Sequence, residues 1–157
     1  MKSSKRGERP LIKKILVAFD GSNQSDKALD FTLDLARKYS AQIVLINVIP
    51  FSPISDSSVV IPYGIDYATL YKERRSVHEK LLEEALNKAK TFQKTLQVTK
   101  ELVEGRPADT IVETAKEGMF DLIVIGSRGL GGIKEFFLGS VSNRVADKAP
   151  CPVLIVK

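Results

Sequence analysis

The fold is decided by the stretch DLIVIGSRG, residues 121–129, which a nine-residue interval separates from Gly139 and Ser140. Residues 121–125 contain a continuous apolar run, typical of a strand that a parallel sheet buries on both faces. Gly126 ends this run, and a glycine lets the backbone approach a ligand without a Cβ between them. The stretch therefore predicts the carboxyl end of a buried strand, which is the edge where open α/β sheets bind ligands.

The glycine-rich loop after this strand predicts an anion site. Residues 139–143 are interpreted as a helix start, where unpaired N–H groups and the positive end of the helix dipole favour phosphate. Ser140 and Ser142 add hydroxyl donors. Positive φ, which lets N–H groups converge on an anion, is open to Gly129, Gly131 and Gly132. In the alternative interpretation the glycines only turn the chain and a serine only caps the helix.

Apolar runs alternate with helical periodicities along the rest of the chain, which predicts βαβ units and a mainly parallel sheet. Further strands are expected at 14–20, 42–49, 98–104 and 153–156. The helix after the first strand is expected to use Ser25 as its N-cap.

Three more helices are expected. Arg106-Pro107 opens one of them, since proline suits the first helical turn, and the last spans 140–148. A long helix over 67–95 carries His78 among charged neighbours, so this side chain is expected to be solvated. The inward face of the long helix is predicted to consist of Val77, Leu81, Ala85, Ala89 and Phe92.

Composition limits the function classes. A chain of 157 residues suits one domain, its single cysteine rules out an internal disulfide framework, and no apolar run approaches the roughly 20 residues that span a bilayer. The net charge of +5 resides in residues 1–14, which hold six basic side chains and one acidic, so the remainder is formally neutral. We therefore expect a soluble, cytoplasmic protein without a membrane or nucleic-acid partner.

The spacing G-x-x-G, nine residues, G-S resembles the ATP-binding signature of the universal stress protein family. Residues 14–22 resemble the first strand of the family, 45–49 the second and 149–156 the last. The resemblance predicts one universal stress protein domain over 12–157, preceded by a flexible basic leader at 1–11. It implies an α/β fold with a three-layer, doubly wound, five-stranded parallel sheet of order 3-2-1-4-5, which is Rossmann-like and adenine nucleotide alpha hydrolase-like.

The resemblance also implies an ATP site. Val48 matches the position that recognises adenine through its backbone, and Asn47 stands where other members often carry histidine. Asp20 is expected near the nucleotide, where it would hold Mg or Mn through the phosphates, or else forms only an Asx turn. No catalytic residue is predicted. The remaining implied binding residues are Ala18, Phe19, Gly126, Ser127, Arg128, Gly129, Gly139, Ser140, Val141 and Ser142.

The function that the resemblance implies is that of a homodimeric, nucleotide-dependent regulator in the stress response, acting on a client protein that the sequence does not identify. The chains would pair through the apolar edge strand Val153, Leu154, Ile155 and Val156. Two alternatives stay open: a slow ATPase or nucleotide-processing enzyme, and a dimeric interaction module that binds no nucleotide. Residues 51–66 are expected to cover the nucleotide or to form a plain surface loop.

Overall fold

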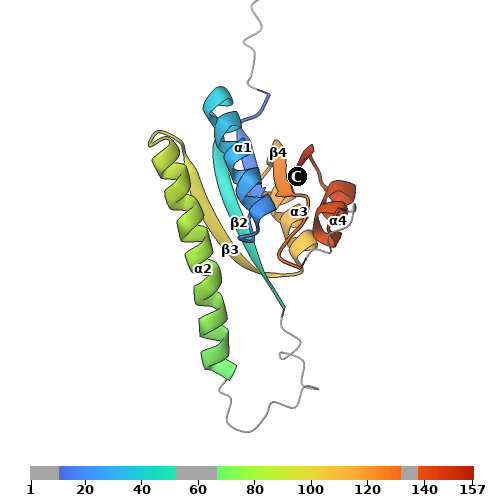
Figure 1. The fold of residues 1–157 in the computed structure, drawn as a ribbon. Helices are drawn as coiled ribbons and strands as arrows, with labels where there is room; N and C mark the ends of the chain where they lie inside the picture. Colours follow the sequence, from blue (N-terminus) through green and yellow to red (C-terminus); the bar gives the residue numbers. More distant parts are fainter. Residues whose placement is uncertain (1–10, 52–66, 132–137) are drawn as a thin grey trace, which may run out of the picture.

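The computed structural model describes residues 11–51, 67–131 and 138–157. Nearly all of the expected basic leader and of the expected cover at 51–66 lie outside these residues. Strands and helices alternate along the chain, as the sequence predicts (Figure 1). In chain order the elements are β1 (Lys14–Ala18), α1 (Asn23–Tyr39), β2 (Gln42–Pro50), α2 (Tyr67–Phe92), β3 (Val98–Gly105), α3 (Pro107–Glu117), β4 (Leu122–Gly126), α4 (Ser140–Lys148) and β5 (Val153–Val156).

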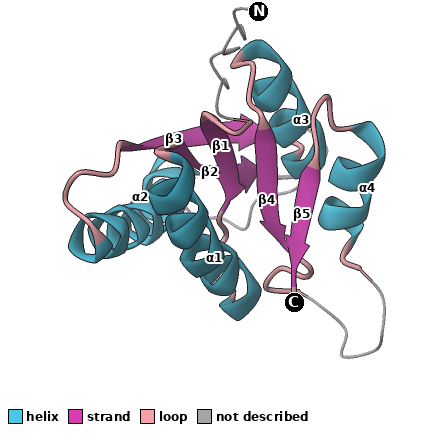
Figure 2. Ribbon diagram, turned by 90° about the horizontal axis from the view of Figure 1, so that it is seen from above, coloured by secondary structure: helices cyan, strands magenta, loops and turns pink. Residues whose placement is uncertain are grey.

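The five described strands form one parallel sheet in the order β3-β2-β1-β4-β5. This confirms the predicted fold class and strand order. Helices α1 and α2 cover one face of the sheet and α3 and α4 the other, so the molecule has three layers (Figure 2). The strand order reverses between β1 and β4, and such a reversal opens a crevice at the carboxyl ends of the strands.

The central strand β1 explains why the sequence contains continuous apolar runs. Its side chains alternate between the two faces, with Ile15 and Val17 in the core under α1 and α2, and Leu16 and Ala18 in the core under α3 and α4. Each of these residues is at most 9% exposed. A strand between two covered faces gains stability from an apolar side chain at every position.

The N-cap of α1 is Ser22, so the prediction of Ser25 was wrong. Ser22 Oγ accepts a hydrogen bond from Ser25 N at 3.2 Å, and Ser25 Oγ donates to Ser22 O at 2.9 Å. The reason is the tight turn after β1, in which Gly21 has a φ of 82°. This turn lets the helix begin at Asn23 and places Ser25 in its first turn, where it is buried.

The inward face of α2 also differs from the prediction, and the helix ends at Phe92 instead of residue 95. Val77 is 57% exposed and Phe92 is 43% exposed. Four-residue steps alone drift around a helix of 3.6 residues per turn, so one stripe built from them cannot face the sheet throughout. The buried residues follow mixed spacings of three, four and one, and they are Leu82, Ala85, Leu86 and Ala89.

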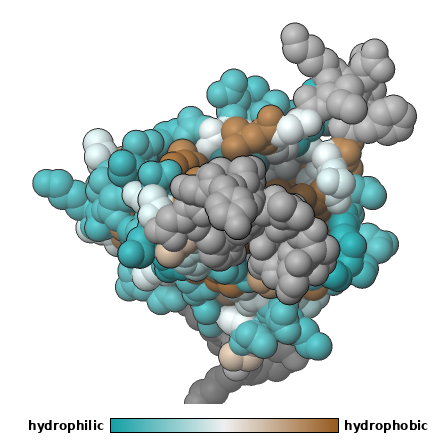
Figure 3. Space-filling view, turned by 90° about the horizontal axis from the view of Figure 1, so that it is seen from below, coloured by the Kyte–Doolittle hydropathy of each residue, from teal (hydrophilic) through white to brown (hydrophobic). Residues whose placement is uncertain are grey.

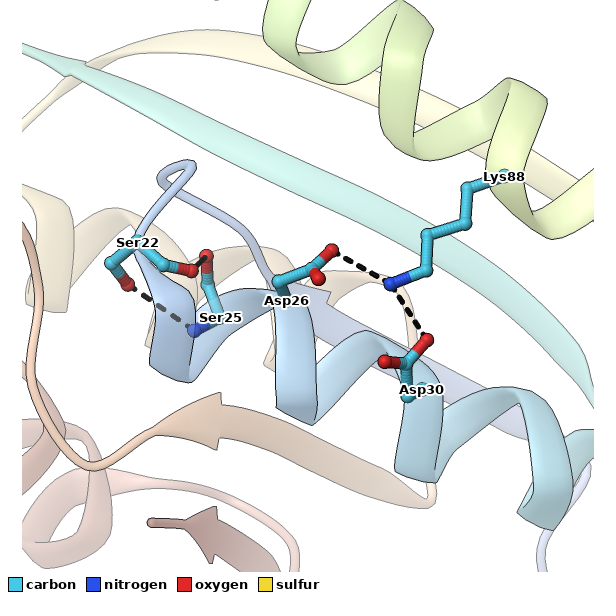
Figure 4. Close-up of polar contacts among 5 residues, drawn as sticks. All are labelled: Ser22, Ser25, Asp26, Asp30 and Lys88. Atoms are coloured by element: carbon cyan, nitrogen blue, oxygen red, sulfur yellow. Dashed lines mark hydrogen bonds and ion pairs between the residues drawn. The ribbon is translucent and has the colours of Figure 1, made fainter.

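One lysine ties α2 to α1. Lys88 Nζ lies 2.8 Å from Asp26 Oδ1 and 2.7 Å from Asp30 Oδ1, so one cation pairs with two carboxylates a helical turn apart (Figure 4). Although α2 has 26 residues, neither it nor any other helix in the described ranges combines the length and the apolar character that crossing a membrane requires.

Candidate functional site

A cavity of about 780 Å³ lies at the carboxyl edge of the sheet, where the strand order reverses. Its size falls within the range of pockets that hold small molecules. The ends of β1, β2 and β4 line it together with residues of α2, α3 and the start of α4. Figure 3 views the molecule from the side toward which β2 ends, and apolar surface is visible there among hydrophilic side chains. Of the twelve predicted binding residues, all but Ser127 line this cavity.

The end of the cavity at α4 suits a negative charge. Gly139 is the N-cap of α4, and no side chain among the described residues caps this helix. The first helical turn also contains no acidic residue, so no described side chain offsets its N–H groups and the positive end of its dipole at the cavity. Exposed Ser140 and the cationic Arg128 line the same end.

Ser127 and Ser142 hold this end together instead of lining it with free hydroxyls. Ser127 O accepts hydrogen bonds from Gly139 N at 2.8 Å and from Ser142 Oγ at 3.0 Å. Ser142 Oγ also lies 3.0 Å from Gly139 O, and its side chain is only 2% exposed. The Ser142 hydroxyl thus donates to carbonyl groups of the protein in this structure, and its predicted bond to a phosphate stays a prediction.

The glycines act through close approach, so the prediction of positive φ was wrong for Gly129 and Gly131. Among the described glycines only Gly21 has a positive φ, and Gly132 lies outside the described residues. A Cβ on Gly129 would lie 2.5 Å from Asp20 Oδ2, and one on Gly126 would lie 2.8 Å from the backbone carbon of Gln24. These glycines thus let the loop after β4 pack against the turn after β1 and against the first turn of α1.

Asp20 forms the Asx turn and is also part of the cavity lining. Its Oδ1 accepts a hydrogen bond from Ser22 N at 3.0 Å, which makes the Asx turn, and the residue also lines the cavity. The part of the chain that the structure describes contains no group of three or more His, Cys, Asp or Glu side chains that could hold a metal ion. One carboxylate suits Mg²⁺ when a substrate supplies phosphate oxygens as further ligands, so Asp20 fits a metal that arrives with a nucleotide.

The end of the cavity at β2 is apolar and offers backbone hydrogen bonds. β1 pairs with β2 only as far as Ala18 and Ile46, whereas β2 runs on to Pro50 beside β3. Ile46 O accepts Phe19 N at 2.9 Å. In a strand, residues two apart point their backbone groups the same way, so the N–H and C=O of Val48 point to the side on which β1 has ended. The side chains of Ile46, Val48, Pro50, Pro107 and Ile111 line this end.

His78 was predicted to be solvated, and this was wrong. Its imidazole is half-buried and lines the cavity at the β2 end. His78 Nδ1 lies 2.7 Å from Asn47 Oδ1, and Asn47 Nδ2 donates to Phe19 O at 2.7 Å. Burial and, to a lesser extent, the positive charge of Arg74 lower the pKa of His78. Its spacing from Leu82, Ala85 and Ala89 is the signal in the sequence that places it on the inward face.

A doubly wound α/β domain with a cavity at its strand-order reversal belongs to a class of proteins that bind ligands at that edge. The sequence profile of the universal stress protein family matches residues 11–157. Universal stress protein YxiE of Bacillus subtilis is 39% identical over 153 residues, which cover 94% of this chain and 100% of the relative.

Solved structures agree with the sequence matches. The universal stress protein UspA from Lactobacillus plantarum is 25% identical and superimposes with a TM-score of 0.76, over 93% of this chain and 98% of the other. A universal stress protein solved in complex with cAMP is 28% identical, with a TM-score of 0.66 over 93% and 97% of the two chains. The chain therefore belongs to the universal stress protein family.

Proposed function

We propose that this chain is an ATP-binding universal stress protein that acts in the cytoplasm as a homodimeric, nucleotide-dependent regulator of a stress response. The observation that carries the proposal is the chemical polarity of the cavity at the sheet edge. Arg128 and a helix N-terminus that no described side chain caps lie at one end, and an apolar compartment with the backbone groups of Val48 lies at the other. A nucleotide has the same polarity, and a relative of 28% identity has been solved with cAMP.

This polarity supports one orientation of the nucleotide. The phosphates bind at Arg128 and at the N–H groups of Ser140 and Val141, where the helix dipole favours an anion. The base lies on the apolar side chains at the end of β2 and bonds to the backbone of Val48. Asp20, between the two ends, holds Mg²⁺ or Mn²⁺ through the phosphates.

Retained nucleotide is the first test. The purified protein is denatured and the supernatant is chromatographed, and calorimetry with ATP, with and without Mg²⁺, follows on nucleotide-free protein. We expect an adenine nucleotide in the supernatant and saturable ATP binding. A protein that retains none and gives no heat with ATP would be the interaction module that binds no nucleotide.

Gly139→Val locates the site. A Cβ at Gly139 meets its nearest atom, Arg128 Cα, at 3.4 Å, and φ and ψ of −61° and 154° suit any residue. The variant therefore folds, but its methyl groups occupy the space of the phosphates, so ATP binding is lost. The matched control is Ala146→Val, since Ala146 is exposed on the same helix and does not line the cavity. Unchanged ATP affinity in folded Gly139→Val would place the nucleotide elsewhere.

Product formation separates the regulator from a slow ATPase. Incubation of the protein with ATP and Mg²⁺ or Mn²⁺ for hours, followed by quantification of ADP and AMP, is expected to show no turnover above that of Gly139→Val. Turnover that the variant loses would assign an enzyme.

The dimer is proposed at β5, which pairs within the described sheet only with β4. Val156 O accepts Ser127 N at 2.7 Å, and Pro152 O accepts Ile123 N at 3.0 Å. The backbone groups of the even-numbered residues thus point to β4, and those of Val153 and Ile155 point outward, where a second copy can pair with them.

Ile155→Pro tests this arrangement, because it removes an outward N–H and leaves the bonds to β4 in place. Light scattering is expected to find a wild-type dimer at micromolar concentration and a folded Ile155→Pro monomer. Leu154→Pro is the contrasting variant, since its N–H points to β4 and its loss destabilises the protomer itself. A monomeric wild type would reject the dimer.

A further inference from the structure

A buried amide fixes the proton on the chain's only histidine. Asn47 is 2% exposed, and its Nδ2 donates to Phe19 O at 2.7 Å. The opposite amide orientation would set two oxygen atoms against each other at that distance, so Oδ1 is the atom that faces His78 Nδ1, at 2.7 Å. An amide oxygen only accepts hydrogen bonds. His78 Nδ1 therefore carries a proton and donates it to Asn47.

The second ring nitrogen of His78 is consequently an acceptor. Burial and Arg74 favour the neutral imidazole, and a neutral ring with its proton on Nδ1 has a lone pair on Nε2. Within the described residues no partner occupies Nε2. Arg74, one helical turn earlier, is itself held by a hydrogen bond from its Nη2 to Pro50 O. The ring is thus fixed between two elements, α2 and β2, with one acceptor left.

His78 lines the cavity, and its hydrogen-bond partner Asn47 belongs to β2, at whose end the base is proposed to bind. Val48, Pro50, Arg128 and the start of α4 line the same cavity. Sugar hydroxyls and exocyclic amino groups are the hydrogen-bond donors of a nucleotide. With the phosphates at α4, the donors nearest to β2 are those of the base.

We propose that His78 is a specificity-determining residue that reads the nucleobase, its Nε2 accepting a hydrogen bond from an exocyclic amino group while Asn47 holds the tautomer. The inference rests on the proposed nucleotide site. It selects a 6-aminopurine against hypoxanthine, whose 6-oxo group is an acceptor and would meet the Nε2 lone pair. A site that must bond an amino group discriminates by leaving its own buried polar atom unpaired when the wrong base binds.

The chain offers a matched variant, His78→Asn. The Asn Nδ2 takes the place of imidazole Nδ1 and donates to Asn47, but the shorter side chain presents no acceptor at the position of Nε2. Wild type and His78→Asn are titrated by calorimetry with ATP, ITP and purine riboside triphosphate, which carry an amino group, an oxo group and hydrogen at position 6. We expect ATP affinity to fall about fivefold in His78→Asn, the worth of one neutral hydrogen bond, and the affinity for the 6-hydrogen analogue to stay within twofold.

The outcomes separate the two proposals. Absence of binding of all three nucleotides to the wild type would remove the nucleotide site itself. Binding to the wild type with equal losses for ATP and the 6-hydrogen analogue in His78→Asn would leave the site and overturn the role of His78, because a purely structural residue affects both ligands alike.

Nitrogen-15 NMR gives an independent readout, since in untagged protein the single histidine needs no assignment. We expect a protonated Nδ1 and an unprotonated Nε2 in the free protein, and an ATP-induced shift of the Nε2 resonance that ITP does not produce. A proton on Nε2, or an Nε2 resonance that ATP leaves unchanged, would overturn the proposal.

Discussion

Two helices begin at the same edge of the sheet, and their first turns differ. At α1, Ser22 caps the helix through its side chain, and Asp26 in the first turn adds a negative charge (Figure 4). At α4, the N-cap is Gly139, without a side-chain cap from any described residue and without an acid in the first turn. α1 thus satisfies its own N-terminus, whereas α4 leaves its N–H groups and dipole to a ligand.

The difference shows that the N-cap residue decides whether the N–H groups of a helix start are used within the protein or remain for a ligand. Ser22 also donates from Oγ to Arg128 O at 3.3 Å. The N-cap residue of α1 therefore helps to position the loop that leads from β4 to α4. The capped N-terminus of α1 therefore helps to hold in place the anion site at the N-terminus of α4.

The largest effect is expected from giving α4 a side-chain N-cap like that of α1. Gly139→Asp places a carboxylate on the free N–H groups, where it excludes phosphate. We expect ATP affinity to fall about 100-fold, roughly 2.7 kcal/mol, while the free energy of unfolding rises by a few tenths of a kcal/mol. Calorimetry and urea denaturation measure the two changes. Undiminished ATP affinity would show that the open N-terminus does not hold the phosphates.

The second largest effect is expected from removing the side-chain N-cap of α1. Ser22→Ala removes a buried hydroxyl that both accepts from Ser25 N and donates to Arg128 O. We expect the free energy of unfolding to fall by about 1 to 2 kcal/mol, as urea denaturation would measure. Ser140→Ala is the control, because Ser140 is the exposed first residue of α4, directly after the N-cap, and its loss should leave stability unchanged. Equal losses in the two variants would remove the contrast between the helices.

A smaller effect is expected where the loop after β4 packs against Asp20 in the turn before α1. In Gly129→Ala the new Cβ displaces the carboxylate from Gly129 and strains its bond to Ser22 N. We expect a loss of about 1 kcal/mol of stability, comparable to one hydrogen bond, and weaker Mg²⁺ dependence of ATP binding. Gly131→Ala is the matched control, since a Cβ there meets no described atom within 4 Å. Identical denaturation midpoints for the two alanine variants would contradict the close packing.

The smallest effect concerns pH and the opposite end of the cavity. The pKa of His78 is lowered in the folded chain from 6.5, so below that pH the unfolded chain binds the proton more readily. This contribution to stability is present above about pH 6.5 and is lost as the pH falls toward the folded pKa. Urea midpoints should drop between about pH 7.5 and pH 5.5 more in the wild type than in His78→Asn. A steeper drop in the variant would contradict the sign.

Most of the fold could be predicted because the apolar runs of the strands leave little choice. The runs at 122–125 and 15–18 are buried on both faces, and the residues between strands have lengths that only helical crossovers fill. The start of α1 was predicted wrongly because two serines close together in the sequence could each serve as its N-cap. Ser22 and Ser25 both suit an N-cap, and only the turn at Gly21 selects the first of them.

The sequence predicted where the site lies better than it predicted which contacts the individual residues make there. Glycines after β4 indicated close approach, yet the sequence does not reveal that Asp20 and Gln24 are what approaches. Ser142 has the hydroxyl that a phosphate donor needs, but in the structure this hydroxyl donates to the carbonyl of Ser127, fifteen residues earlier in the chain. His78 was missed because its partner Asn47 is on another element, and a contact between distant segments has no local signal.

The bonds at Ser127 have a consequence for evolution and engineering. Ser127 N donates to Val156 O, and Ser127 O accepts from Gly139 N and Ser142 Oγ, so Ser127 and Gly139, the two ends of the segment between them, are held together by hydrogen bonds. Closing a longer loop is inexpensive, about 0.6 kcal/mol for each doubling of length. Because Ser127 and Gly139 stay joined whatever the length between them, a longer connection between these two residues should cost little stability.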